Sequence, residues 1–212
     1  MKLFFGTISN DYLTLKRVLL TSELPGATIY TQEDAKSATE GWNELLETAE
    51  IGKNDIAVFS HQDIYYPEGW LHKFESGIKQ LPDSWIIAGF FGIGKDKTPC
   101  GKIWDRRMGS LLQTAHELPR EVLNVDGCAF AVNLNKGFRF EELKGFDCYD
   151  IYAGCMAREL GGTVWVIDAP PEHWATRAWN WTPDAVFMEN IKWLKQRFPN
   201  ERTISTCHNE RT

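Results

Sequence analysis

The sequence predicts an α/β fold in which helices cover both faces of a mostly parallel sheet. First, segments with strand-like and helix-like patterns alternate three times between Lys2 and Gln80. Second, the segment Ile56 to Phe59 is continuously apolar, which is typical of a strand that is buried on both faces. Third, the chain has 212 residues, 43% of them hydrophobic, which is enough for one globular domain with a sizeable core.

Each predicted element has a local reason. The strands are short runs of β-forming residues, and the helices carry apolar residues three or four positions apart. Ser9-Asn10-Asp11 is a capping cluster before the first helix, and Gly161-Gly162 closes a later one. Residues 92–107 contain Gly, Lys, Asp and Pro and predict a loop. In chain order we expect strand 2–8, helix 12–20, strand 27–30, a helix from Ser37, strand 55–60, helix 68–80, strand 85–91, a β-rich segment 122–134, helix 149–160, strand 163–167 and a helix from 182 to 198.

Charge, cysteines and hydropathy narrow the function classes. The chain has 23 basic and 29 acidic residues, a formal charge of −6 and no basic run, so a duplex nucleic-acid partner is not expected. Its five cysteines are irregularly spaced without a Cys-x-x-Cys pair, which favours reduced thiols. The N-terminal apolar run ends at Gly6-Thr7 and is too short for a signal peptide, and residues 85–94 make only about half a membrane span. We therefore expect a cytoplasmic protein without a transmembrane segment.

Polar residues follow each of the first three predicted strands. In mostly parallel sheets, ligands bind beyond the carboxyl ends of the strands. These positions are therefore candidates for a ligand site: Thr7, Ser9, Thr31, Gln32, His61, Gln62 and Asp63.

Two histidines and one aspartate form a candidate metal site. His61 and Asp63 lie two positions apart after the buried strand, where an extended backbone directs both side chains to the same side. His173 follows the strand 163–167 and would lie on the same side of the sheet. A carboxylate with nearby imidazoles can hold a divalent ion. On these residues alone, the favoured interpretation is a turn-capping Asp63 and a hydrogen-bonded loop histidine, because short His-x-Asp strings are common by chance.

Asp150 lies at the start of the predicted helix 149–160. A helix N-cap explains an aspartate at such a position. The alternative is a general base at the sheet edge, with a pKa that the helix N-terminus lowers. Both interpretations predict an ionised carboxylate.

Four segments together resemble the family-2-like glycosyltransferases, and among them the subgroup named for a streptomycin-biosynthesis protein. The order of these segments along the chain carries the resemblance more than any one of them does. They are Gly41–Leu46, Val58–Asp63, Val125–Ala131 and Phe138–Asp150.

The resemblance implies a GT-A fold with a Rossmann-like sheet and a smaller mixed β region. Residues 1–198 would form a single domain, with a nucleotide-sugar half at 1–92 and an acceptor half at 93–198, followed by a polar tail at 199–212. It implies that Asp63 contacts a divalent metal, Mn²⁺ or Mg²⁺, and the diphosphate. Asn43 would face the nucleotide, and Asp150 would be the base of an inverting enzyme. Asp126, in a glycine-containing turn, would contact the donor sugar or the acceptor.

The expected function is therefore transfer of a sugar from a nucleoside-diphosphate sugar to an acceptor hydroxyl of a saccharide or another compound. The expected donor-binding residues are Thr7, Ser9, Gln32, Asn43, Asp63 and Asp126. Two alternatives stay open. One is a metal-dependent hydrolase that uses His61, Asp63 and His173. The other is a non-catalytic protein that binds nucleotide sugars.

Overall fold

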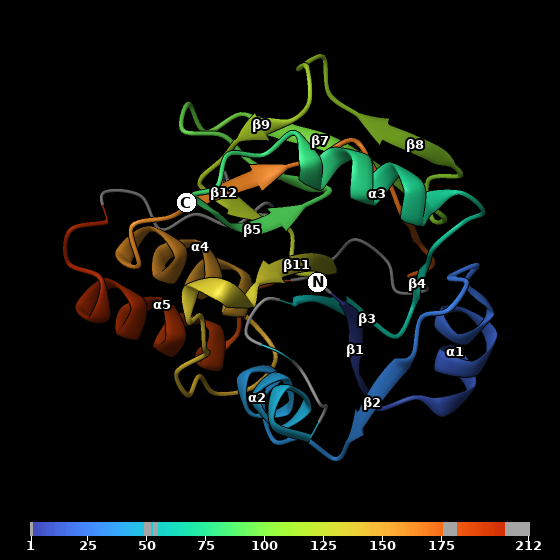
Figure 1. The fold of residues 1–212 in the computed structure, drawn as a ribbon. Helices are drawn as coiled ribbons and strands as arrows, with labels where there is room; N and C mark the ends of the chain where they lie inside the picture. Colours follow the sequence, from blue (N-terminus) through green and yellow to red (C-terminus); the bar gives the residue numbers. More distant parts are fainter. Residues whose placement is uncertain (1, 49–51, 53–54, 176–181, 202–212) are drawn as a thin grey trace.

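The main feature of the computed structural model is a seven-stranded mixed sheet in the order β2-β1-β3-β11-β5-β12-β9 (Figure 1). The structure describes residues 2–48, 52, 55–175 and 182–201. Strands β1, β2, β3, β5 and β12 run in one direction, and β11 and β9 run in the other. The strand bounds are β1 Leu3–Ser9, β2 Ile29–Glu33, β3 Ile56–His61, β5 Trp85–Gly89, β9 Arg120–Glu121, β11 Ala129–Asn133 and β12 Thr163–Val166.

The α/β fold is confirmed, with one qualification to the parallel arrangement. The N-terminal strands are parallel, with β1 between β2 and β3, as their alternation with helices predicts. β11 is antiparallel to both of its neighbours, β3 and β5, which makes the whole sheet mixed. The β-rich composition of the segment 122–134 indicates strands but contains no information about their direction.

A second, smaller mixed sheet has six strands, in the order β10-β6-β7-β13-β4, with β8 paired to β7. This arrangement corrects the prediction of a loop over residues 92–107. β7 is held by pairing with β6, β8 and β13, and so depends on distant partners. Its Gly101 has a φ of +128°, and a Cβ there would collide with the carbonyl oxygen of Phe90. The bounds are β4 Ile64–Tyr65, β6 Phe91–Ile93, β7 Pro99–Asp105, β8 Ser110–Gln113, β10 Asn124–Val125 and β13 Glu172–His173.

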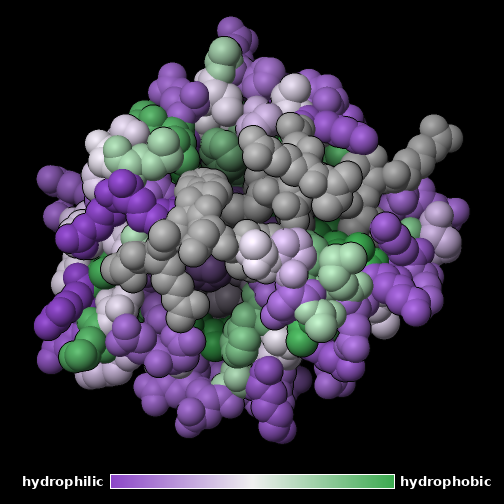
Figure 2. Space-filling model, turned by 180° about the vertical axis from the view of Figure 1, so that it is seen from behind, coloured by the Kyte–Doolittle hydropathy of each residue, from purple (hydrophilic) through white to green (hydrophobic). Residues whose placement is uncertain are grey.

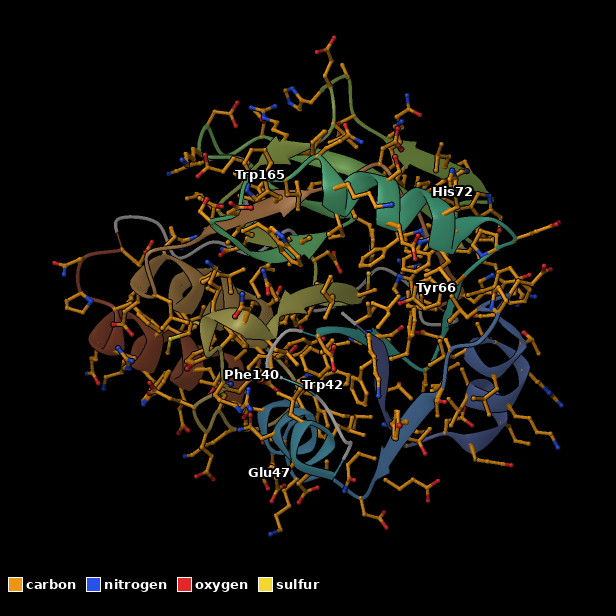
Figure 3. The ribbon with its side chains drawn as sticks, in the orientation of Figure 1. Trp42, Glu47, Tyr66, His72, Phe140 and Trp165 are labelled. Atoms are coloured by element: carbon orange, nitrogen blue, oxygen red, sulfur yellow. The ribbon has the colours of Figure 1, made fainter. Side chains whose placement is uncertain are left out.

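Helices cover both faces of the main sheet (Figure 1). Side chains alternate along β1, so that Phe4 joins the core beneath α2 and α4, and Phe5 joins the core beneath α1 and α3. Trp42 of α2 and Phe140, both labelled in Figure 3, belong to the first of these cores. The helix bounds are α1 Tyr12–Arg17, α2 Ala38–Thr48, α3 Trp70–Lys79, α4 Tyr149–Glu159 and α5 Ala185–Arg197, with short 3₁₀ helices at Leu19–Thr21 and Leu134–Lys136.

The surface fits the polar composition of the chain. On the face shown in Figure 2, hydrophilic residues make up most of the periphery, and apolar residues lie in small groups among them. Within the described part of the chain, no helix has both the length and the apolar composition needed to cross a bilayer. Most of the predicted polar tail, residues 202–212, lies outside the described residues.

Candidate metal and active site

β3 and β13 bring the three candidate metal ligands together. β3 ends at His61, and a tight turn leads through Asp63 into the short strand β4. β4 pairs with β13 so that His173 lies opposite Ile64, and the N–H of Trp174 donates to the carbonyl oxygen of Asp63 at 2.8 Å. The backbone of the second sheet therefore places His173 beside Asp63.

The geometry of this cluster suits one divalent ion. His173 Nε2 lies 3.5 Å from Asp63 Oδ2, and His61 Nδ1 lies 3.9 Å from Asp63 Oδ1. One ligand atom from each residue can be chosen so that all three lie within 4.8 Å of one another. Nitrogen and oxygen ligands lie about 2.1 Å from such ions, so two ligands of one ion are at most about 4.2 Å apart. Small side-chain shifts would let all three residues reach the same ion.

The hydrogen bonding of Asp63 supports the fit of a cation. Its Oδ1 is buried and has no hydrogen-bond partner among the described residues. A buried carboxylate oxygen without a partner is costly unless a positive charge is near it. A cation between Asp63 and the two imidazoles would satisfy this atom.

The pKa values of Asp63 and His173 shift in opposite directions, because each group stabilises the charged form of the other. Burial raises the pKa of Asp63, but the contact with His173 and the charges of both histidines outweigh it, and the pKa lies below its ordinary value. Burial lowers the pKa of His173, but the contact with Asp63 and the charges of Asp63 and Asp126 outweigh it, and this pKa is raised. A metal ion would bind His173 in its neutral form, because a protonated imidazole has no lone pair to offer.

Asp126 lies in the turn between β10 and β11. Its N–H donates to the carbonyl oxygen of Phe91 at 2.8 Å, and its Oδ1 accepts from the N–H of Cys128 at 2.9 Å. These bonds fix the carboxylate close enough for its charge to raise the pKa values of both His173 and Asp150. The tertiary structure thus brings Asp126 into the neighbourhood of the histidine cluster.

Asp150 occupies the first turn of α4, and the N-cap position belongs to Cys148, whose φ is 67°. The capping interpretation of Asp150 is therefore wrong. Burial and the negative charge of Asp126 raise the pKa of Asp150 to about 7, and they outweigh the backbone hydrogen bonds at the helix N-terminus that lower it. The prediction that the helix N-terminus lowers the pKa of Asp150 is therefore wrong, because desolvation raises this pKa by more than the terminus lowers it.

Two predicted donor-binding residues lie at the expected edge. In the sheet register, Ile8 pairs with Gln32 on one side and with His61 on the other. Ser9 is the last residue of β1, and its hydroxyl donates to the side-chain oxygen of Gln62 at 2.8 Å. The carboxyl ends of β1, β2 and β3 therefore meet where the parallel arrangement predicts.

Thr7 and Asn43 occupy different surroundings from those expected. Thr7 has 0% exposure, so its side chain presents no surface to a nucleotide. The amide nitrogen of Asn43 donates to the carbonyl oxygen of Phe140 at 2.9 Å, and its oxygen accepts from the N–H of Phe140 at 3.3 Å. The Asn43 side chain therefore braces the backbone at Phe140.

Sequence patterns missed several residues beside the cluster. Asp105 is buried opposite His173 in the β7–β13 pairing, and its carboxylate pairs with Arg107. The charges of Asp63 and Asp126 also raise the pKa of Arg107. No motif identifies Asp105, because its neighbour His173 comes from a strand far along the chain. Tyr149, next to Asp150, contacts His61 with its hydroxyl at 2.6 Å.

Comparison with known proteins supports the fold. No family model matches this sequence, and no curated protein matches it either. The fold is similar to the crystal structure of GalNAc-T7, a GT-A glycosyltransferase, with UDP, GalNAc and Mn²⁺: the TM-score is 0.65 at 10% identity over 92% of this chain. The match covers 48% of that chain, so this protein spans about half its length. A second structure, A197 from STIV, has a TM-score of 0.47 at 13% identity, covering 82% of this chain and 86% of that one. The similarity shows a GT-A-like fold and gives no support to the streptomycin-biosynthesis subgroup.

Proposed function

We propose that this protein is a metal-dependent glycosyltransferase that moves a sugar from a nucleoside-diphosphate sugar to an acceptor hydroxyl. The observation that carries the proposal is the cluster of His61, Asp63 and His173 at the carboxyl edge of β3. This cluster lies near two further carboxylates on a GT-A-like fold. The solved structure with the similar fold contains UDP, GalNAc and Mn²⁺, which supports the same classes of ligand here.

The metal would be held by Asp63 and the two imidazoles. Carboxylates suit Mg²⁺ and Mn²⁺, whereas imidazoles favour later and softer ions, so this donor set favours Mn²⁺ over Mg²⁺. When bound, the ion would supply positive charge against the diphosphate leaving group. Of the residues expected to bind the donor, the proposed site keeps Ser9, Gln32, Asp63 and Asp126. It does not include Thr7 or Asn43.

Asp150 would act as the base. Its carboxylate takes the proton from the acceptor hydroxyl as the hydroxyl oxygen bonds to the anomeric carbon. The bond from that carbon to the diphosphate breaks on the opposite face, so the configuration inverts. A pKa of about 7 suits this role, because a base works best when its pKa is near the working pH.

A thermal-shift screen of nucleoside diphosphates and nucleotide sugars, with and without Mn²⁺, tests the proposal. Specific binding to the native state raises the melting temperature, and the expected result is a rise that needs both nucleotide and metal. Release of nucleoside diphosphate on addition of an acceptor would then show transfer. Binding without release would favour the non-catalytic alternative. Hydrolysis of phosphoesters or amides without a sugar donor would favour the hydrolase.

A further inference from the structure

Tyr149, the first residue of α4, links His61 to the turn that contains Asp126. Its hydroxyl oxygen lies 2.6 Å from His61 Nε2 and 2.8 Å from the carbonyl oxygen of Gly127. The ring is 5% exposed, and its centroid lies 6.2 Å from that of Phe130 in a stacked arrangement. Packing therefore holds the hydroxyl in place between its two partners.

The protons available for these two contacts determine the tautomer of His61, that is, which of its ring nitrogens carries the proton. A carbonyl oxygen only accepts hydrogen bonds, and a phenol has one proton to donate. Tyr149 therefore donates to Gly127, and its oxygen accepts from the Nε2–H of His61. A neutral imidazole with its proton on Nε2 carries its lone pair on Nδ1.

Nδ1 is also the nitrogen of His61 that faces Asp63. It lies 3.9 Å from Oδ1, the buried oxygen with no hydrogen-bond partner among the described residues. In this tautomer, the lone pair of His61 Nδ1 faces the electron pairs of Asp63 Oδ1 across that distance, and the two atoms repel each other. A cation placed between them would attract both atoms. Gly127 is part of the arrangement, since a Cβ there would lie 2.8 Å from the Tyr149 hydroxyl.

We infer that Tyr149 holds His61 in the Nε2–H tautomer and thereby makes Nδ1 its metal-binding nitrogen. Tyr149 is then a positioning residue behind the metal site. Such partners orient metal-bound imidazoles, and their loss weakens metal binding by about 10- to 100-fold. The inference rests on the metal-binding half of the proposed function and does not depend on sugar transfer.

The first test compares two tyrosines of the same helix. Tyr152 is also buried on α4, and its hydroxyl donates to the carbonyl oxygen of Arg139 at 3.2 Å. Tyr149→Phe and Tyr152→Phe each remove one phenol-to-carbonyl bond, but only the first removes the partner of His61. Isothermal titration with Mn²⁺ should show affinity about 10- to 100-fold weaker in Tyr149→Phe and nearly unchanged in Tyr152→Phe. Unchanged affinity in Tyr149→Phe, or equal losses in both variants, would overturn the inference.

The second test measures the tautomer directly and needs no folded Tyr149 variant. In ¹⁵N-histidine-labelled wild-type protein without metal, at a pH where imidazoles are neutral, two-bond ¹⁵N–¹H correlations should show His61 protonated at Nε2. The signal is assigned by its absence in His61→Gln. Protonation at Nδ1 would overturn the inference.

The two proposals fail in different ways. Metal binding that depends on Tyr149, without any transfer from nucleotide sugars, would support this inference and contradict the proposed function. A wild-type protein that binds no Mn²⁺ would overturn both.

Discussion

The side-chain oxygen of Gln62 accepts a hydrogen bond from the hydroxyl of Ser9 at 2.8 Å, which joins the end of β3 to the end of β1. The same oxygen accepts from the N–H groups of Asn10 at 3.1 Å and Asp11 at 3.0 Å. The amide nitrogen of Gln62 donates to Asn10 Oδ1 at 2.8 Å. One side chain therefore connects the loop after β1 to the turn that contains Asp63.

Gln62→Ala should lower stability and weaken donor binding. Its bonds to Ser9, Asn10 and Asp11 would be lost, at a cost of about 1 to 3 kcal/mol in the free energy of unfolding, measured by urea denaturation. Gln32→Ala is the control for stability alone, because Gln32 belongs to the proposed donor site. Its amide nitrogen donates to the carbonyl oxygen of the neighbouring Glu33 at 3.2 Å, and its loss should change stability by about 0.5 kcal/mol or less. Equal stability of both variants would contradict the bracing role of Gln62.

Asp63→Ala should abolish Mn²⁺-dependent stabilisation while unfolding stays cooperative. At a metal concentration 100 times the Kd, the wild-type protein should gain about 2.7 kcal/mol, and the variant close to nothing. Asp168→Ala is the matched control, since this exposed carboxylate pairs with Lys102 at 2.6 Å on the surface. Differential scanning fluorimetry with and without Mn²⁺ measures the effect. An undiminished shift in a folded Asp63→Ala variant would remove Asp63 from the site.

Asp150→Asn should separate chemistry from binding. Transfer should drop by about 10² to 10⁴, the usual contribution of a positioned base, while donor and metal binding remain. The wild-type rate should rise with pH through about 7, because the base must be ionised and its pKa is raised to about 7. Initial rates of nucleoside-diphosphate release from pH 5 to 9 measure both effects. Near-normal transfer in the variant would refute the mechanism.

The same carboxylate should make stability depend on pH. The raised pKa of Asp150 means that the native state retains a proton which the unfolded state loses above about pH 4. Its contribution to stability therefore falls as pH rises from about 4 to about 7, by about 1 to 4 kcal/mol. Asp150→Asn should lack this loss, and urea unfolding at pH 5 and pH 8 would reveal the difference. Parallel pH profiles of both proteins would contradict the raised pKa.

Asn43→Ala should affect folding more than binding. Both polar atoms of the Asn43 amide are hydrogen-bonded to the backbone of Phe140. Losing them should lower the free energy of unfolding by about 1 to 3 kcal/mol and leave donor affinity nearly unchanged. Weaker donor binding at unchanged stability would instead restore the role that the family resemblance implies for Asn43.

Sequence periodicity was sufficient for the elements held by local patterns. α3 and α4 begin and end within two residues of their predicted bounds, because apolar spacing and flanking residues define them. β7 was missed, because its glycine and proline indicate a loop by composition, and only its pairing with three other strands makes it extended. The sequence pattern likewise could not predict the direction of β11, because the composition of a strand is the same in either direction.

The sequence by itself determined the α/β fold, the carboxyl edge of β1 to β3 as the candidate site, and residue types that could hold a divalent ion. These follow from short-range periodicity and from the rule that parallel strands end at one edge. Only the tertiary structure decided which polar residues meet. The β4–β13 pairing brings His173 to Asp63, and Tyr149 reaches His61 from the start of a distant helix. Burial beside Asp126 then raises the pKa of Asp150 to about 7. Desolvation and charge depend on every element packed around a group, and no local stretch of sequence contains that information.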